Sequence, residues 1–430
     1  MIDRAHLRLL LLLPAMAVAL LSAAQTDDEQ TELRLAPEIE LNLPEVVNPE
    51  KYPFLDLSAN RIELNGADWS RLGAKFEGAR NADSLFSVVY LGDSHVQADF
   101  GGDVLRDRLT ALSRNAGRGI TIPFRLASTN QPVDYTIRSE SGVKASKLLK
   151  QPWATDMPFT GIGIRPLARN HNFTISCRRR FSRVNIYYMG AGPEVTAVTD
   201  AGVKLPYEVF DSGPGELSVR LDRSVESLRL GLRSDNLRTT YAGFELLSDT
   251  VGTVVHSIGN NGATYGSYNR VEDMGRGLAR LHPDLVIIAL GTNEAFGRAS
   301  AADIRAEIDI LVSDIRRENP GAQLLLVGPA ECYRKVYRYV RRKGRRRRVS
   351  STVVNAKVKT VRDIIRAYAA DQGIPYYDHY GVAGGSGAAA KMKAAGILGR
   401  DGIHYSATGY RLWGSLLADA IMAGLVVCPQ

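Results

Sequence analysis

One serine stands where a nucleophile is needed. Residues 87–95 resemble an apolar strand that ends at a glycine, and Ser94 follows on the turn directly after it. A reactive hydroxyl must project from rigid backbone, and the N–H groups of a following helix can stabilise a developing oxyanion. A polar turn after a strand is equally common in proteins that perform no chemistry there. Ser94 is therefore informative only if the rest of the chain supplies partners for it.

Residues that could serve Ser94 occur in three later segments. Asp401 and His404 lie three positions apart beside a glycine, so one turn could present both side chains. Histidine can take the proton of a serine hydroxyl, and a carboxylate fixes its tautomer and stabilises the imidazolium. The Ser94 N–H, the Gly262 N–H and the Asn293 amide could donate to an oxyanion. Glycine at 262 also suits a place where backbone approaches a substrate closely.

The other histidines that we considered need not take part in the chemistry. His256, His282 and His379 are each interpreted as ordinary, partly buried residues. His95 is adjacent to the serine, so its side chain is expected to point elsewhere. We interpret it as a substrate-side or structural residue.

The elements that must position these residues follow an α/β rhythm. Apolar runs predict strands at 87–91, 251–257, 285–290, 323–327 and 375–377. Helical spacing predicts helices at 99–112, 269–281, 303–317, 353–370 and 407–425. Alternating strands and helices predict a parallel, doubly wound sheet. The four candidate segments would then meet at the carboxyl ends of its strands, where function collects in such sheets.

A segment with a different residue pattern interrupts this alternation of strands and helices. Between residues 129 and 249, short alternating runs are separated by Gly, Pro, Asp and Asn, which favours an antiparallel β-sandwich. The first strand of the parallel sheet precedes the segment and the others follow it, so it is an insertion. We predict a catalytic domain from 84–128 plus 250–427, the insert at 129–249, and an N-terminal lead-in and extension at 25–83.

The N-terminus has the features of an export signal. Arg4 and Arg8 precede an apolar stretch at 9–21, and small residues at 22–24 form a cleavage site. We predict a cleaved signal peptide at 1–24 and a periplasmic or secreted protein; the alternative is an uncleaved anchor. No later segment has the length of a transmembrane helix.

The three cysteines are scattered and lack the spacing of a zinc site. One disulfide with a free thiol and three buried thiols are both compatible with Cys177, Cys332 and Cys428. No metal or cofactor is predicted.

The positive charge of the chain is local. Residues 334–348, from Arg334 to Arg348, contain ten Lys or Arg and no acid, and without them the formal net charge of +8 becomes −2. The run could be a solvated loop, or it could attract an anionic glycan or surface near the rim of the site. Tyrosines within it could stack on sugar rings or pack inward. Nucleic acid is a poor candidate partner for an exported protein.

The blocks at 92–94, 262, 291–293 and 401–404 resemble the four signature blocks of the SGNH, or GDSL-like, hydrolases. The resemblance implies a flavodoxin-like three-layer α/β/α fold and ester or O-acetyl hydrolysis without a metal. It implies Ser94 as nucleophile, His404 as base and Asp401 as its partner, with Gly262 and Asn293 completing the oxyanion hole.

Two details of these blocks need comment. Gly262 is preferred to Gly259 because the Ala-Thr after it resembles the family continuation. Glu294 departs from the common Gly-x-Asn-Asp pattern, but Asn293 carries the family role.

The position of the insert resembles that in periplasmic peptidoglycan O-acetylesterases of Gram-negative bacteria, where the insert is similar to a carbohydrate-binding module. The resulting hypothesis is an exported serine esterase that removes O-acetyl groups from a cell-wall or extracellular polysaccharide, with peptidoglycan first. One alternative is a polysaccharide O-acetyltransferase that uses the same triad. Another is a non-catalytic glycan-binding protein with a vestigial hydrolase domain.

Overall fold

A computed structural model describes residues 47–342 and 345–426. Its six-stranded sheet has the order β1-β18-β15-β14-β2-β13, and all neighbours are parallel except the edge pair β1-β18. The strands are β1 (Ile62–Glu63), β2 (Phe86–Gly92), β13 (Thr253–Gly259), β14 (Leu285–Ala289), β15 (Gln323–Val327) and β18 (Tyr376–Tyr377). Counted along the chain, the parallel strands have the order of a flavodoxin-like sheet, as expected for this fold class.

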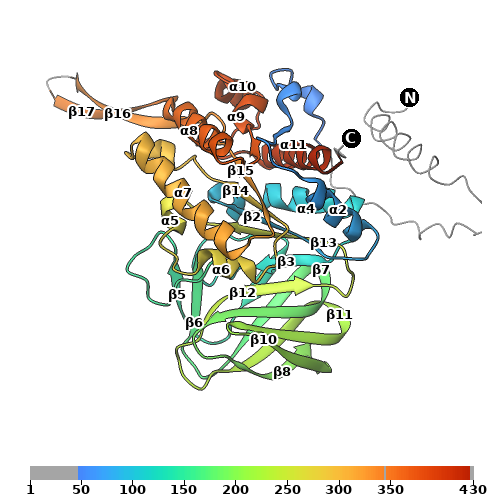
Figure 1. The fold of residues 1–430 in the computed structure, drawn as a ribbon. Helices are drawn as coiled ribbons and strands as arrows, with labels where there is room; N and C mark the ends of the chain where they lie inside the picture. The colour runs from blue at the N-terminus through green and yellow to red at the C-terminus, as the bar shows by residue number, and fades with distance from the viewer. Residues whose placement is uncertain (1–46, 343–344, 427–430) are drawn as a thin grey trace, which may run out of the picture.

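Helices cover both faces of this sheet, which is why its strands are apolar throughout (Figure 1). Along β2, Val88 packs in one hydrophobic cluster and Val89 in the other, because successive side chains point to opposite faces. One face carries α2 (Ser70–Arg80), α4 (Phe100–Leu112) and α11 (Ala407–Val426). The other carries α5 (Tyr265–Tyr268), α6 (Met274–Ala279), α7 (Ala301–Glu318) and α8 (Lys357–Asp371). The fold is therefore three-layered.

Two helices differ from the sequence expectation. Of the helix expected at 269–281, only Met274–Ala279 (α6) is helical; α5 ends before this range, and turns occupy residues 269–273 between the two helices. Thr264 and Ser267 form a capping box at the start of α5, and the Asn269 side chain at its end donates to Glu307. The helix expected at 353–370 begins only at Lys357, because a strand occupies the preceding residues.

The β-rich segment forms one continuous ten-stranded sheet in which the pairs are antiparallel. Its strands are β3 (Gly117–Thr121), β4 (Tyr135–Arg138), β5 (Val143–Lys147), β6 (Ile162–Pro166), β7 (Asn170–Met189), β8 (Glu194–Asp200), β9 (Val203–Lys204), β10 (Tyr207–Gly213), β11 (Glu216–Arg233) and β12 (Thr240–Leu247). Runs expected as separate strands join in β7 and β11, which bend at register shifts such as that between Arg220 and Val225. The first strand, β3, lies ahead of residue 129, where the sequence places the start of the insert, because the chain enters this sheet soon after α4.

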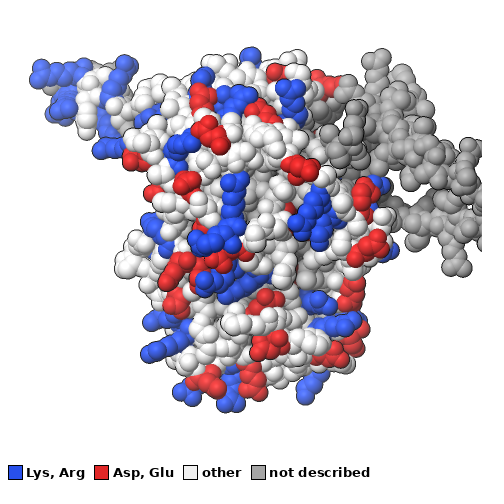
Figure 2. Space-filling view, in the orientation of Figure 1, with Lys and Arg blue, Asp and Glu red and all other residues white. Residues whose placement is uncertain are grey.

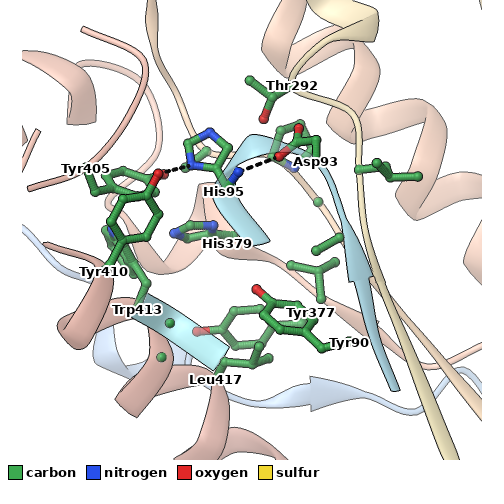
Figure 3. Close-up of a pocket in the computed structure, with 18 residues that line it drawn as sticks. Tyr90, Asp93, His95, Thr292, Tyr377, His379, Tyr405, Tyr410, Trp413 and Leu417 are labelled. Carbon is green, nitrogen blue, oxygen red and sulfur yellow. Dashed lines mark hydrogen bonds between the residues drawn. The ribbon is translucent and has the colours of Figure 1, made fainter. Parts of the chain in front are cut away.

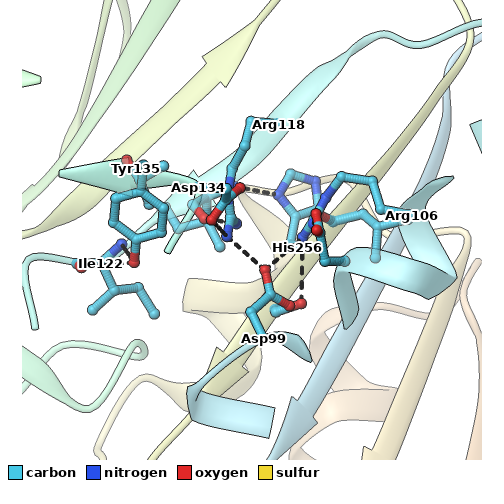
Figure 4. A network of polar contacts seen from close by, with 12 residues as sticks. Asp99, Arg106, Arg118, Ile122, Asp134, Tyr135 and His256 are labelled. Atoms are coloured by element: carbon cyan, nitrogen blue, oxygen red, sulfur yellow. Dashed lines mark hydrogen bonds and ion pairs between the residues drawn. The ribbon is translucent and has the colours of Figure 1, made fainter. Parts of the chain in front are cut away.

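A buried ionic network joins α4 to the ten-stranded sheet (Figure 4). Asp99, at the start of α4, accepts from Arg106 at 3.0 Å and from Arg118 of β3 at 2.5 Å. Arg118 also donates to Asp134 at 2.9 Å, and both guanidinium groups are buried. Burial opposes the charge on Asp134, but Arg118 and then Arg106 outweigh it and lower its pKa. Removing one partner would strand a buried charge, so the network fixes this junction.

The basic run forms a hairpin, not a loop. Strands β16 (Tyr333–Arg342) and β17 (Arg345–Val354) pair antiparallel and project from the body of the protein (Figure 1). The remaining short helices are η1 (Pro49–Lys51), η2 (Leu57–Ala59), α3 (Ser94–Gln97), η3 (Glu294–Phe296), α9 (His379–Val382) and α10 (Ala388–Ala394).

The signal peptide expected at 1–24 and the first part of the lead-in lie outside the described residues, as does Cys428. The described part of the extension packs on the sheet, where β1 pairs with β18 and α2 contacts β2. Among the helices of the described ranges, none is long and apolar enough to cross a membrane.

Candidate active site

Ser94 is the first residue of α3, two residues after the end of β2, which lies between β14 and β13 in the sheet. Gly92 ends the strand where no side chain fits, since a Cβ there would lie 2.3 Å from Val96 and 2.8 Å from the Ala289 carbonyl oxygen. The Asp93 side chain caps α3 by accepting from the His95 N–H at 2.8 Å. The serine hydroxyl is thereby held at the carboxyl end of the sheet.

His404 and Asp401 reach Ser94 from the loop before α11. His404 Nε2 lies 2.8 Å from Ser94 Oγ, and His404 Nδ1 lies 2.6 Å from Asp401 Oδ2. The other oxygen of Asp401 accepts from the backbone N–H groups of Ile403 and His404, each at 3.0 Å. The turn that the Asp-Gly spacing indicated thus presents both side chains to the serine.

The protonation of this chain of groups follows from Asp401. Partial burial opposes ionisation of Asp401, but hydrogen bonds from His404 and from the backbone outweigh burial and lower its pKa. An ionised carboxylate only accepts, so the proton of neutral His404 sits on Nδ1. Nε2 is then the acceptor that faces Ser94 Oγ. This is the arrangement that a general base for a serine hydroxyl requires.

The expected oxyanion donors line the same cleft as the triad. Ser94, Gly262, Asn293 and His404 all border one open cavity of about 610 Å³. Gly262 has φ +81°, and within the described part of the chain neither its N–H nor that of Ser94 has an acceptor. Both N–H groups are therefore available to a ligand.

Asn293 differs from the simple expectation. Its Nδ2 donates to Asp93 Oδ2 and to the Ala263 carbonyl oxygen, both at 2.9 Å, so both amide hydrogens are engaged. The amide holds the Ser94 turn and the Gly262 loop together. It can donate to an oxyanion only after releasing one of these two bonds.

Sequence reasoning missed a polar wall of the cleft. The buried Gln97 side chain donates to the carbonyl and side-chain oxygens of Asn130 at 2.8 Å each, and it accepts from the Asn261 N–H at 2.7 Å. Asn261 also donates to Asn130 at 2.5 Å. Asn130 and Asn261 border the cleft beside Ser94. Only the proximity of Gln97 to the serine hinted at this in the sequence.

Comparison with known proteins agrees with this geometry. Residues 227–412 match the family described as GDSL-like Lipase/Acylhydrolase. The chain carries a GDSL-like acylhydrolase domain. The match begins inside β11 and does not include Ser94, but β2 lies between β13 and β14 in the same sheet and brings Ser94 to His404. No match was found among curated proteins.

One solved structure shares the overall fold of this chain, and two others align with lower scores. A structure titled "Peptidoglycan O-acetylesterase in action, 5 min" aligns with a TM-score of 0.68 and 21% identity, over 85% of this chain and 99% of that one. A lipase/acylhydrolase from Enterococcus faecalis aligns with a TM-score of 0.28 and 20% identity, over 40% of this chain and 77% of that one. An active-site mutant of a family two carbohydrate esterase from Clostridium thermocellum aligns with a TM-score of 0.28 and 12% identity, over 66% of this chain and 98% of that one.

A second, smaller cavity is bordered by Asp93 and His95, the chain neighbours of Ser94 (Figure 3). It measures about 60 Å³ and is lined by aromatic rings together with small and aliphatic residues. His95 lines it and receives or donates a hydrogen bond with the Tyr410 hydroxyl at 3.2 Å, while its ring lies 5.3 Å from that of His404. Burial, and then the nearby His404, lower the pKa of His95 to about 3. His95 is thus neutral and packs behind His404 without opposing an imidazolium there.

The other histidines lie away from the reacting groups. His256 is buried on β13, where its Nδ1 accepts from the Ile120 N–H at 3.1 Å, and burial lowers its pKa to about 3. Burial lowers the pKa of His379, in the inner cavity, to about 4. His282 is exposed. Cys177 and Cys332 are buried free thiols, which leaves no disulfide between them.

Proposed function

We propose that this acylhydrolase is an exported serine esterase that removes O-acetyl groups from a polysaccharide. One observation carries the proposal: the hydrogen-bonded chain from Ser94 through His404 to Asp401, with separations of 2.8 Å and 2.6 Å. These are the roles that a covalent acyl-transfer mechanism assigns to a nucleophile, a base and an orienting carboxylate.

The proposed reaction has two halves. Ser94 Oγ attacks the acetyl carbonyl carbon while His404 Nε2 takes the hydroxyl proton, and the carbonyl oxygen becomes an oxyanion. The tetrahedral intermediate collapses to an acetyl-Ser94 ester when His404 returns the proton to the departing sugar oxygen. Water then gives its proton to His404 and attacks the ester, which releases acetate and restores Ser94.

The free N–H groups of Ser94 and Gly262 would hold the oxyanion in both halves. Asn293 would join them by exchanging its bond to Ala263 or Asp93 for one to the oxyanion. Ser94, Gly262 and Asn293 border one cavity, which supports a common role for the three donors at the ester.

The cleft supports a sugar ester as substrate. It is open, has room for a sugar unit, and presents the amides of Asn130 and Asn261, which suit hydroxyl and N-acetyl groups. A structural neighbour that covers most of the chain is titled a peptidoglycan O-acetylesterase, so peptidoglycan is the first polymer to test. The sequence at 1–24 favours export to such a polymer, and the sheet from 129 to 249 fits a carbohydrate-binding role.

Acetate release from a panel of O-acetylated polymers tests the proposal. We expect release from at least one cell-wall or extracellular glycan, and loss of that release in Ser94→Ala. If the pure protein cleaves no acetyl ester, small or polymeric, the esterase proposal is wrong and the glycan-binding alternative gains. If an unacetylated acceptor glycan becomes acetylated and less free acetate is released, the enzyme is a transferase.

A further inference from the structure

The hairpin β16–β17 concentrates positive charge on a thin, two-stranded ribbon. Figure 2 shows Lys and Arg gathered over it at one extremity of the molecule. Among the side chains of the hairpin that the structure describes, none forms an ion pair with a carboxylate. Cations held together without acidic neighbours repel one another, so the arrangement costs free energy in the isolated protein. An anionic partner would remove that cost.

The two faces of the ribbon differ. Side chains alternate between faces along a strand, and the pairing of Tyr339 with Arg348 sets the register. One face therefore carries Lys335, Tyr337, Tyr339, Arg341, Arg346 and Arg348. The opposite face carries valines between its arginines, namely Val336, Val340, Val349 and Val353 with Arg338, Arg345 and Arg347.

On the first face, which we call the tyrosine face, arginines stack on exposed rings. The Arg348 guanidinium lies 3.7 Å from the centre of the Tyr337 ring, and that of Arg346 lies 4.1 Å from the Tyr339 ring. Tyr337 and Tyr339 are 56% and 60% exposed, so the rings are presented to solvent and not packed inward. The stacking on a ring holds each planar guanidinium in place on this face of the ribbon.

The base of the ribbon is fixed to both catalytic loops. The Tyr333 N–H donates to the carbonyl oxygen of Gly402, which lies between Asp401 and His404, at 2.8 Å. At the other end, the buried Asn355 side chain donates to the Ala295 carbonyl oxygen at 3.1 Å, two residues after Asn293. A polymer on the ribbon would therefore be held close to the mouth of the cleft.

We propose that the tyrosine face binds a carboxylate-bearing stretch of the same glycan whose esters the cleft would cleave. The inference rests on the proposed function for the identity of that glycan. Guanidinium forks match carboxylates in pairs of parallel hydrogen bonds, and tyrosine rings offer flat apolar surface to sugar rings. A membrane surface fits less well, because interfacial segments insert Trp, Phe or Leu, and this ribbon has none of them.

Binding in a Ser94→Ala background tests the proposal without turnover. The probe is polygalacturonate, a soluble polyuronate, at low ionic strength. The variant carrying Lys335→Gln, Arg341→Gln, Arg346→Gln and Arg348→Gln should bind about tenfold more weakly, since four exposed charge pairs are lost. The parent should also lose affinity as salt is added, and the variant much less.

A matched control removes the same charge elsewhere. Arg138, Lys144 and Lys204 are exposed on strands of the ten-stranded sheet, and Arg169 is exposed in the turn before β7. None of the four has an ion pair in the described structure. Replacing these four by glutamine should leave polygalacturonate affinity within about twofold. Equal weakening in both quadruple variants would show a general charge effect and overturn the proposal. So would hairpin-dependent binding to phosphatidylglycerol vesicles without binding to polygalacturonate.

Turnover separates this proposal from the esterase proposal. The substrates are acetylated polygalacturonate and an aryl acetate. In the hairpin variant, kcat/KM for the polymer divided by kcat/KM for the aryl acetate should fall about tenfold. A variant that merely disturbs the catalytic loops lowers both rates and leaves the ratio unchanged, which counts against the proposal. If no ester is cleaved at all, the esterase proposal fails while the binding result still decides the role of the hairpin.

Discussion

Replacing Asp401 by asparagine should slow the acylhydrolase without unfolding it. Asp401 has two tasks that use different oxygens: Oδ2 faces His404 Nδ1, and Oδ1 accepts from the backbone of the same loop. Asparagine keeps one acceptor oxygen for the backbone and places an NH₂ group against Nδ1. That donor favours the His404 tautomer with its proton on Nε2, which cannot accept from Ser94.

The size of the effect can be worked from the separation of the charges. At the 2.6 Å between Nδ1 and Oδ2, Coulomb's law gives about 1.6 kcal/mol in bulk water and about 6 kcal/mol at an effective dielectric constant near 20. The two side chains are 41% and 48% exposed, so the effective value lies between these limits. A loss of about 3 to 4 kcal/mol of imidazolium stabilisation corresponds to a fall in kcat of about 10² to 10³.

The assay is initial-rate hydrolysis of a small aryl acetate, with Asp401→Ala measured beside Asp401→Asn. If the charge and tautomer matter, both variants lose kcat to a similar degree and KM changes little. If the carboxylate only orders the loop, asparagine retains nearly full activity and alanine loses it. An Asp401→Asn enzyme within threefold of the parent would refute the assignment of Asp401 as the orienting carboxylate.

Three further predictions concern single sites. Gly262→Ala should lose more than tenfold in kcat because its added Cβ opens into the cleft. Gly202 has a similar φ, +84° against +81°, so Gly202→Ala should suffer the same backbone strain of about 1 to 2 kcal/mol but not the loss of kcat. Equal losses of activity in the two variants would contradict this. Burial raises the pKa of Glu294 to about 7, so the folded state binds more protons than the unfolded state and stability falls as pH rises from about 4.5 to 7. The stability advantage of Glu294→Gln over the parent should therefore grow between pH 5 and pH 8, to at most about 3 kcal/mol, with a corresponding rise in Tm. A difference in Tm that stays constant with pH would exclude ionisation of Glu294 in this range. Burial also raises the pKa of the Cys332 thiol to about 12 and that of Cys177, so mass-mapped alkylation should label both only after unfolding, and native labelling of either would contradict their burial.

The α/β rhythm predicted the catalytic sheet well because continuous apolar strands such as 285–290 can occur only where both faces are covered. The family match and the shared fold agree with it. The helix expected at 269–281 was wrong because periodicity does not register the capping by Thr264 or the outward bonds of Asn269. Alternation in the β-rich segment found the strands but not their continuity, since β7 and β11 turn corners through register shifts.

Some residues of the candidate site could be predicted from the sequence, and others could not. Ser94, Asp401 and His404 could be named from the sequence because chemistry dictates their types and the strand ends dictate their positions. Asn130 could not, because it lies in a loop of the β-rich segment and is held at the cleft by contacts with Gln97 and Asn261 that are distant in sequence. The hairpin was not predicted, because arginines and lysines lie on both of its faces and obscure the alternation of apolar and polar residues that marks a half-buried strand.

Two buried carboxyl groups, those of Asp93 and Glu294, adjoin Asn293: Asp93 accepts from its amide, and Glu294 follows it in the chain. Burial raises the pKa of Asp93 and of Glu294 to about 7, and each charge would further oppose the other. Below that pH both carboxyls favour the neutral form, so an oxyanion can develop beside Asn293 without a like charge nearby. Above it, an ionised Asp93 also holds the Asn293 amide more tightly, because a charged acceptor makes the stronger hydrogen bond. Oxyanion stabilisation should therefore weaken on the alkaline side. We predict that kcat falls as the pH rises through about 7, and that this fall begins at a lower pH in Glu294→Gln, because loss of one carboxylate lowers the pKa of the other.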